Sequence, residues 1–256
     1  MSAAQVETAL ITGASSGLGA EFARQLGATR TNLVLVARDA ARLEAKAVRL
    51  RQEFGIDVQV LPADLLTDDG VAAVGARLAD RAAPVSTLVN SAGHGLVTPF
   101  DRSTVAEELD HLRLLVTTPL QLSHAAIGPM LERGHGRIIN VSSISAFIPR
   151  GTYGAAKAWI LSFSRWANWQ YASRGVHVTA VCPGFVHTEF HQRMRADMGR
   201  VPRWMWLDAE RVVREALADS AAGKGVSVPT KRFKVLAALG RFAPTSWAAA
   251  AGNRGR

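Results

Sequence analysis

The chain has 256 residues, 48% of them hydrophobic and 20% charged, which is the composition of a globular protein. No apolar run reaches the roughly 20 residues that a membrane-spanning helix needs, and the single cysteine, Cys182, excludes an internal disulfide. The N-terminal residues also lack the basic and apolar regions of a signal peptide. Together these features favour a cytoplasmic location.

The net charge of +9 is concentrated near the C-terminus. Residues 220–256 hold seven basic residues and no acidic one, which is +7 of the +9: Lys224, Lys231, Arg232, Lys234, Arg241, Arg254 and Arg256. The rest of the chain is nearly neutral, so its charge gives no reason to expect a nucleic-acid partner. Because the basic C-terminal segment, 220–256, also carries Phe, Leu and Trp, we expect it either to pack on the body as a helix or to touch a membrane or an acidic partner.

Short β-branched runs alternate with longer amphipathic segments along the chain. The runs predict seven strands, at 8–12, 32–38, 57–65, 86–93, 137–143, 176–184 and 225–229. Several are apolar at successive positions, which is typical of strands covered on both faces, and segments such as 39–54 show helical periodicity. The alternation predicts one α/β domain, a doubly wound parallel sheet of about seven strands with helices on both faces.

A glycine-rich turn follows the first strand and opens a helix. The sequence "TGASSGLG", residues 12–19, places Gly13, Gly17 and Gly19 between these two elements. Glycine permits a positive φ and lets the backbone approach a pyrophosphate, while the helix N-terminus presents free N–H groups to it. Ser15 and Ser16 add hydroxyl donors. The turn therefore predicts a dinucleotide site of the Rossmann kind.

The end of the second strand indicates which dinucleotide is bound. A cofactor with a free ribose 2′-hydroxyl usually meets Asp or Glu there, but this chain has Ala37 followed by Arg38. An arginine favours a 2′-phosphate through charge-assisted hydrogen bonds, so we expect NADP(H) in preference to NAD(H). The alternative is that Arg38 is only a solvated surface charge. Asp39, one residue later, is expected to cap the next helix.

The sequence "GTYGAAKAW", residues 151–159, places Tyr153 four residues before Lys157. On a helix these side chains share a face, with Cβ atoms about 5–6 Å apart. A free tyrosine has a pKa of about 10, and a nearby ammonium favours its phenolate form. The spacing therefore predicts that Tyr153 exchanges protons with a substrate and that Lys157 lowers its pKa toward neutrality.

With these residues in view, the chain resembles the short-chain dehydrogenase/reductase family from residue 8 to about residue 190. The resemblance lies in six motifs in order: "TGASSGLG" (12–19), "ADL" (63–65), "NSAG" (90–93), "NVSS" (140–143), "YGAAK" (153–157) and "PGFVHT" (183–188). It implies an oxidoreductase that transfers hydride between NADP(H) and a carbonyl or alcohol carbon. It also implies that Tyr153 gives the proton, that a serine holds the oxygen, and that Lys157 binds the nicotinamide ribose.

The resemblance assigns further site residues. The catalytic serine is Ser143, with Ser142 as the alternative. The expected cofactor contacts are Gly13, Ser15, Ser16, Gly17, Leu18, Gly19, Arg38, Asp64, Leu65, Asn90, Ala92, Gly93, Tyr153, Lys157, Pro183, Gly184, Val186 and Thr188. The expected substrate contacts are His94, Phe147, Phe185 and Phe190. No metal site is expected, because His187 and His191 do not form a recognised ligand motif.

The chain divides, on this resemblance, into a cofactor-binding and catalytic core (1–184), a variable substrate lid (185–207) and the basic C-terminal segment. The lid is rich in Phe, Met and Trp, so we expect a hydrophobic ketone or a 3-oxoacyl chain as substrate, unless these residues merely pack the lid on the body. The helix at 161–175 is expected to pack against its copy in a homodimer or homotetramer; a monomer is the alternative.

Two features depart from the family pattern. Ser143 and Tyr153 are ten residues apart, a shorter interval than usual, and Leu115 occupies the position of a usual asparagine. Pro119, four residues after Leu115, has no N–H to donate to the Leu115 carbonyl, and our hypothesis is that this carbonyl holds a water. The alternative is a weakened enzyme, or a non-catalytic NADP(H)-binding sensor or scaffold, which would need the glycine loop but not Tyr153 and Lys157.

Overall fold

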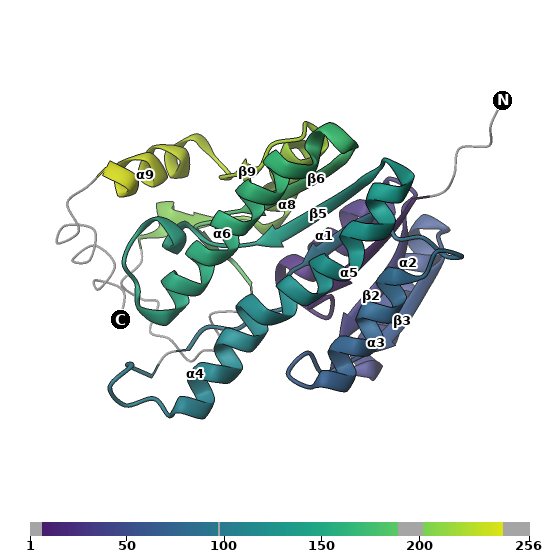
Figure 1. Cartoon of the computed structure of the whole chain (residues 1–256), viewed down its shortest axis with the longest axis horizontal. Helices are drawn as coiled ribbons and strands as arrows, with labels where there is room; N and C mark the ends of the chain where they lie inside the picture. Colours follow the sequence, from purple (N-terminus) through teal and green to yellow (C-terminus); the bar gives the residue numbers. More distant parts are fainter. Residues whose placement is uncertain (1–6, 97, 189–201, 243–256) are drawn as a thin grey trace.

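In the computed structural model, which describes residues 7–96, 98–188 and 202–242, seven parallel strands form one sheet (Figure 1). Its order is β3-β2-β1-β4-β5-β6-β9. The strands are β1 (Thr8–Thr12), β2 (Asn32–Ala37), β3 (Val58–Pro62), β4 (Thr87–Asn90), β5 (Gly136–Val141), β6 (Val176–Val181) and β9 (Val226–Ser227). All seven predicted strands are confirmed. Most end earlier than predicted, because the polar and glycine-containing residues that follow them leave the sheet as loops.

Helices cover both faces of this sheet. They are α1 (Gly17–Ala28), α2 (Ala40–Phe54), α3 (Asp68–Ala79), α4 (Val105–Leu112), α5 (Thr118–Arg133), α6 (Gly151–Tyr171), α8 (Ala209–Ala221) and α9 (Lys231–Phe242). One core cluster lies between the sheet and α1, α2 and α8, and a second lies between the sheet and α3, α5 and α6. Neighbouring residues of β1 belong to different clusters: Ile11 lies in the first and Leu10 in the second. The predicted doubly wound α/β fold is therefore confirmed.

The corner between β2 and α2 has the predicted cap. The Asp39 carboxylate accepts a hydrogen bond of 2.9 Å from the backbone N–H of Arg42, which satisfies a donor of the first helical turn. Because the helix starts immediately after this residue, Arg38 is left exposed at the carboxyl edge of the sheet. This edge is also where the glycine loop lies.

Helix α4 passes into α5 through a π-helical turn, Arg113–Thr117, which the sequence analysis did not predict. The N–H of Thr118 donates to the carbonyl of Arg113, five residues earlier. Pro119 at the start of α5 cannot donate to Leu115 in the usual α-helical way, and a wider turn accommodates this missing donor. The residue that replaces the family asparagine thus lies within the irregular turn.

The predicted lid segment has structure at both of its described ends. The short strands β7 (Phe185–Val186) and β8 (Trp206–Leu207) pair with each other in a second, two-stranded parallel sheet. Residues 189–201 lie outside the described residues, and with them the predicted substrate contact Phe190.

Within the basic C-terminal segment, Lys231–Phe242 form helix α9, which packs on the body, the first of the two alternatives that the sequence leaves open. Phe233 is fully buried in a cluster with Val186, Leu207 and Val212, and its ring occupies the space in which a side chain on Gly184 would lie. Contact with a membrane surface stays a prediction. Within the described ranges, no helix combines the length and apolarity needed to cross a membrane.

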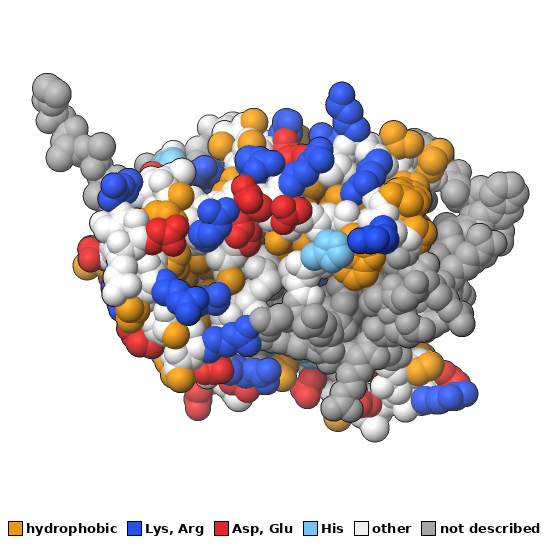
Figure 2. Space-filling model, turned by 180° about the vertical axis from the view of Figure 1, so that it is seen from behind, with side chains coloured by type: hydrophobic (Ala, Val, Ile, Leu, Met, Phe, Trp, Pro, Cys, Tyr) orange, Lys and Arg blue, Asp and Glu red, His pale blue; other side chains and the backbone are white. Residues whose placement is uncertain are grey.

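The face of the molecule opposite to α6 carries charges of both signs. Figure 2 shows Lys and Arg side chains interspersed with Asp and Glu over this face. Helix α1 lies on the opposite face of the sheet from α6 and carries a 2.7 Å ion pair between Arg24 and Glu21. The visible part of this face therefore presents no continuous basic patch for a nucleic-acid backbone.

Candidate active site

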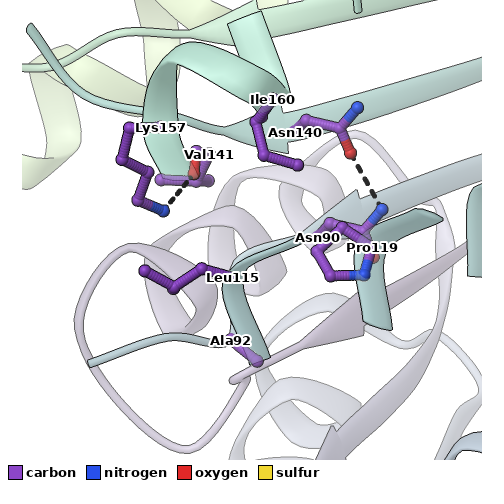
Figure 3. A pocket seen from close by; sticks show the side chains of 8 residues that line it. All are labelled: Asn90, Ala92, Leu115, Pro119, Asn140, Val141, Lys157 and Ile160. Atoms are coloured by element: carbon purple, nitrogen blue, oxygen red, sulfur yellow. Dashed lines mark hydrogen bonds between the residues drawn. The ribbon is translucent and has the colours of Figure 1, made fainter. Parts of the chain in front are cut away.

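The predicted catalytic residues come from two elements that meet at the carboxyl end of β5. Val141 is the last residue of β5, and α6 begins shortly after it and carries Tyr153 and Lys157. The Lys157 ammonium donates a hydrogen bond of 2.8 Å to the Val141 carbonyl (Figure 3). The Ser142 hydroxyl donates one of 2.8 Å to the carbonyl of Lys157. These two buried bonds fix α6 against the strand.

The structure brings Ser143, and not Ser142, together with Tyr153. The hydroxyl of Ser142 is already engaged with the backbone of α6. The hydroxyl of Ser143 accepts a 3.1 Å hydrogen bond from the N–H of Ser145, and it lies close enough to the Tyr153 side chain to lower the tyrosine pKa. The short interval between the two residues is bridged by a 3-10 turn, Ile144–Phe147, so the trimmed loop does not separate them.

The predicted proximity of Tyr153 and Lys157 is confirmed, but the predicted lowering of the tyrosine pKa is wrong for this structure. The ammonium of Lys157 lies 5.7 Å from the centre of the Tyr153 ring. Burial raises the pKa of Tyr153 above its ordinary value, and the Ser143 hydroxyl and the charge of Arg150 oppose this only in part. Burial also lowers the pKa of Lys157 to about 8, since a desolvated ammonium is unfavourable.

The glycine loop needs its glycines. Gly13 and Gly17 have φ values of 67° and 56°, which side chains rarely adopt. A Cβ on Gly13 would lie 2.9 Å from the Cα of Ala92, and one on Gly19 would collide with the carbonyl of Gly13. The loop is therefore packed directly against the "NSAG" loop that follows β4.

The residues at this edge fit a dinucleotide with a 2′-phosphate. The Ser16 hydroxyl makes no capping bond to α1, and the first turn of α1 has no acidic residue, so its N–H groups can bind phosphate oxygens. Thr188 comes from the other end of the site, where its Cβ lies 3.5 Å from the position of a Cβ on Gly17. Arg38 is exposed and makes no hydrogen bond or ion pair in the described part of the chain, so its guanidinium can bind a phosphate.

Some predicted cofactor contacts lie deeper than expected. Asn90 is buried, and its amide donates a 2.8 Å hydrogen bond to the side-chain carbonyl of Asn140 on the neighbouring strand. Leu65 is buried in the core cluster beneath α3 and α5. The carbonyl of Pro183 accepts a 2.9 Å hydrogen bond from the N–H of Ile144, which joins the Pro183–Gly184 loop to the loop of the catalytic serine.

A small cavity lies beside Lys157 (Figure 3). It is lined by Asn90, Ala92, Leu115, Pro119, Asn140, Val141, Lys157 and Ile160. It leaves about 10 Å³ for the centre of a water molecule, which is close to the lower limit for holding one. The side-chain oxygen of Asn90 is buried and has no hydrogen-bond partner among the described residues. The cavity thus combines the ammonium with an unused acceptor.

The predicted substrate contacts are dispersed. His94 is exposed at the rim of the site. Phe185 lies 5.9 Å from Trp206, measured between ring centres, where β7 pairs with β8. Phe147 packs on the core cluster of Leu161, Ala180 and Cys182. Among these three predicted substrate contacts, only His94 is connected to Tyr153 by a chain of ring contacts.

That connection is made by His111, a residue that none of the predicted motifs contains. This residue of α4 is 1% exposed, and its ring centre lies 5.6 Å from that of His94 and 6.0 Å from that of Tyr153. Its Nε2 atom has no hydrogen-bond partner among the described residues. The signal that could have found it is its spacing, because it precedes Leu115 by one helical turn.

Comparison with known proteins establishes the family. The profile of the short chain dehydrogenase family matches residues 7–199. The chain belongs to the short-chain dehydrogenase/reductase family, a class of oxidoreductases.

Relatives within the family differ in what their names say they act on. Galactitol 2-dehydrogenase (L-tagatose-forming) of Cereibacter sphaeroides is 33% identical over 202 residues, which are 77% of this chain and 78% of the relative. A short-chain dehydrogenase of Sphingobium yanoikuyae in complex with NADPH is 33% identical, with a TM-score of 0.84 over 91% of this chain and 93% of its own. A bulky-bulky ketone specific alcohol dehydrogenase of Comamonas testosteroni is 31% identical, with a TM-score of 0.80 over 90% of both chains.

Proposed function

We propose that this chain is an NADP(H)-dependent oxidoreductase that interconverts a hydrophobic ketone, or a 3-oxoacyl group, with its alcohol, using Tyr153 as general acid and base. The observation that carries the proposal is the placement of Tyr153 between the Ser143 hydroxyl, which lowers the tyrosine pKa, and the buried ammonium of Lys157. This group lies at the carboxyl edge of the sheet, where ligands bind in open α/β folds.

The bound nicotinamide supplies the hydride in this chemistry. In the reductive direction the Ser143 hydroxyl holds the carbonyl oxygen and stabilises its developing charge, while Tyr153 donates its proton to that oxygen. The proton is restored through Lys157 and one water in the adjoining cavity, held by the side-chain oxygen of Asn90 and by the carbonyl of Leu115, which needs no asparagine side chain for this role.

Two observations support NADP(H) as the cofactor. Arg38 stands exposed at the end of β2, where NAD-binding chains usually carry an acidic residue. The Sphingobium relative was solved in complex with NADPH. A guanidinium at this position would bind the 2′-phosphate through two hydrogen bonds.

The apolar lid favours a bulky substrate. Phe185 and Trp206 contact each other where the lid leaves the body, and Trp204 is exposed next to them along the chain. The specificity of the Comamonas relative for bulky ketones supports the same substrate class. The galactitol dehydrogenase gives the competing expectation of a polar sugar alcohol.

The test is the rate of NADPH oxidation with three kinds of carbonyl compound: an aryl alkyl ketone, a 3-oxoacyl thioester and L-tagatose. Tyr153→Phe is compared with Tyr171→Phe, because these are the two tyrosines of the chain and both lie on α6. We expect turnover of the apolar compounds by wild type and Tyr171→Phe, and a loss of at least about 10²-fold in Tyr153→Phe. Binding of NADPH without turnover of any compound would favour the sensor or scaffold.

A further inference from the structure

Three rings form a row that leads from the surface to the proposed acid and base. His94 is exposed in the loop after "NSAG", His111 lies buried beneath it, and Tyr153 follows. The ring centres are 5.6 Å apart in the first pair and 6.0 Å apart in the second, where the planes differ by 30°. The imidazole of His111 is therefore in contact with the tyrosine whose proton the reaction uses.

The two nitrogens of His111 have different surroundings. One lies toward the backbone of His94, which raises the pKa of the ring, as a nearby carbonyl does. The other nitrogen, Nε2, is buried without a partner among the described residues. Burial, together with the charges of His94 and Lys157, outweighs Glu108 and lowers the pKa of His111 to about 4. The ring is thus neutral near pH 7, and Nε2 is an acceptor.

A purely structural role does not account for this arrangement. An acceptor that is buried without a partner costs about 1–3 kcal/mol, and a leucine or phenylalanine would fill the same space without that cost. Leu115, one turn later, is buried and apolar where the family pattern has a polar side chain. The polar side chain that this helix offers to the site comes from His111 instead.

We propose that Nε2 of His111 accepts a hydrogen bond from an O–H group bound beside Tyr153, which makes His111 a further residue of the active site. The inference rests on the proposed function. The O–H group is either a hydroxyl of the substrate, next to the reacting carbonyl, or a water that orients the reacting groups. In the first case His111 selects hydroxyketones; in the second it serves all substrates equally.

Three substitutions separate Nε2 from the rest of the ring. His111→Phe keeps the packing and removes both nitrogens; His111→Gln places an amide near the Nε2 position; His111→Asn places one near the nitrogen that faces His94. kcat and KM are measured at saturating NADPH with an aryl alkyl ketone and with its α-hydroxy analogue. His124→Gln, an exposed histidine of α5, is the control, and melting temperatures are recorded for all variants.

We expect His111→Phe to lower kcat/KM by about 5- to 10-fold, the effect of one neutral hydrogen bond, and His111→Gln to restore most of it. A loss confined to the hydroxyketone assigns the O–H group to the substrate, and an equal loss with both ketones assigns it to water. The proposal is overturned if His111→Phe is as active as wild type, or if Asn restores activity and Gln does not, because only the side of the ring that faces His94 would then matter.

A binding measurement keeps this test apart from the test of the proposed function. The chain has seven histidines, and ¹⁵N labelling of histidine with His111→Gln as the assignment control gives the resonance of His111 Nε2. We expect this resonance to shift on addition of NADP⁺ and the hydroxyketone, a mixture in which the cofactor carries no hydride with which to reduce the carbonyl. If the wild-type protein shows this shift but turns over no substrate, the proposed function is contradicted and the role of His111 is not. If the resonance does not shift, the proposed role of His111 is overturned.

Discussion

The ammonium of Lys157 donates a hydrogen bond of 2.8 Å to the carbonyl of Val141, the last residue of β5. The bond is buried, and it ties the proton-carrying face of α6 to the strand that leads into Ser143. An ammonium has three N–H donors, so two remain for the cofactor ribose and for the cavity beside Leu115. The protonation state of Lys157 should therefore affect both the stability of the fold and the proposed catalysis.

The stability of the protein should depend on pH through Lys157. Its pKa is about 8 in the folded chain and 10.5 in the unfolded one, so the cost of burying the charge is fully present below pH 8. Between these two values the unfolded chain binds more protons, and stability rises with pH. We expect wild type to gain up to about 3 kcal/mol relative to Lys157→Met between about pH 7 and pH 11. Urea unfolding at each pH gives the free energy of unfolding of both proteins, and Lys231→Met, at an exposed lysine, is the control. If the difference in unfolding free energy between wild type and Lys157→Met does not change with pH, the lowered pKa of Lys157 is contradicted.

Substitution of the two adjacent serines should affect activity and stability to different extents. Ser143→Ala removes the hydroxyl that faces Tyr153, so we expect kcat to fall by about 10²–10³-fold with an unchanged melting temperature. Ser142→Ala removes the buried bond to the Lys157 carbonyl, so we expect a loss of about 1–3 kcal/mol in stability and a smaller loss of activity. Paired kinetics and thermal unfolding decide between these roles, and the reverse pattern would assign catalysis to Ser142.

Arg38 should set the preference between the two nicotinamide cofactors. We expect Arg38→Ala to weaken NADPH binding by about 10- to 100-fold, the range for a charge-assisted hydrogen bond, and to leave NADH binding almost unchanged. Titration of protein fluorescence with each cofactor gives both dissociation constants. Arg49→Ala on the exposed side of α2 is the matched control. An equal change in the dissociation constants of NADPH and NADH would show that Arg38 does not bind the 2′-phosphate.

The exposed aromatic face of α6 should be an interface between copies of the chain. Trp166 is 51% exposed and Trp169 is 79% exposed, and the Trp166 ring makes a tilted contact with Phe163 and an edge-on contact with Tyr171 of its own helix. Such an apolar surface is unusual for a monomer. We expect wild type to be a dimer or tetramer by light scattering, and Trp166→Glu to be a smaller species with unchanged helix content. Val48→Glu, on the exposed side of α2, is the control; a monomeric wild type would contradict this assignment.

Much of the architecture could be predicted because its signals are local in the sequence. The seven strands follow from β-branched runs, and the Asp39 cap and the glycine loop each lie within a few consecutive residues. The pairing of Tyr153 with Lys157 follows from helical spacing alone. The choice of Ser143 over Ser142 needed the family resemblance, and the structure adds the reason, which is that the Ser142 hydroxyl is bound to the backbone of α6.

The remaining features depend on tertiary surroundings. A proline after Leu115 can break, kink or widen a helix, and the sequence alone does not reveal the packing of this turn against α6, which accompanies the π-helical form. The pKa of Tyr153 depends on how deeply it is buried, which spacing does not reveal, and burial outweighs the lowering effects of Ser143 and Arg150. His111 could not be placed because its partners, His94 and Tyr153, come from distant segments of the chain.

The contact between Phe233 and Gly184 has a consequence for engineering. Because the ring of Phe233 fills the volume beside residue 184, the C-terminal helix is a structural part of the loop expected to hold the nicotinamide. A chimaera that takes this loop from a relative must take the matching helix as well, and a larger residue at position 184 requires a smaller one at position 233. Positions 184 and 233 therefore have to be changed together, whether residues are taken from a relative or newly designed.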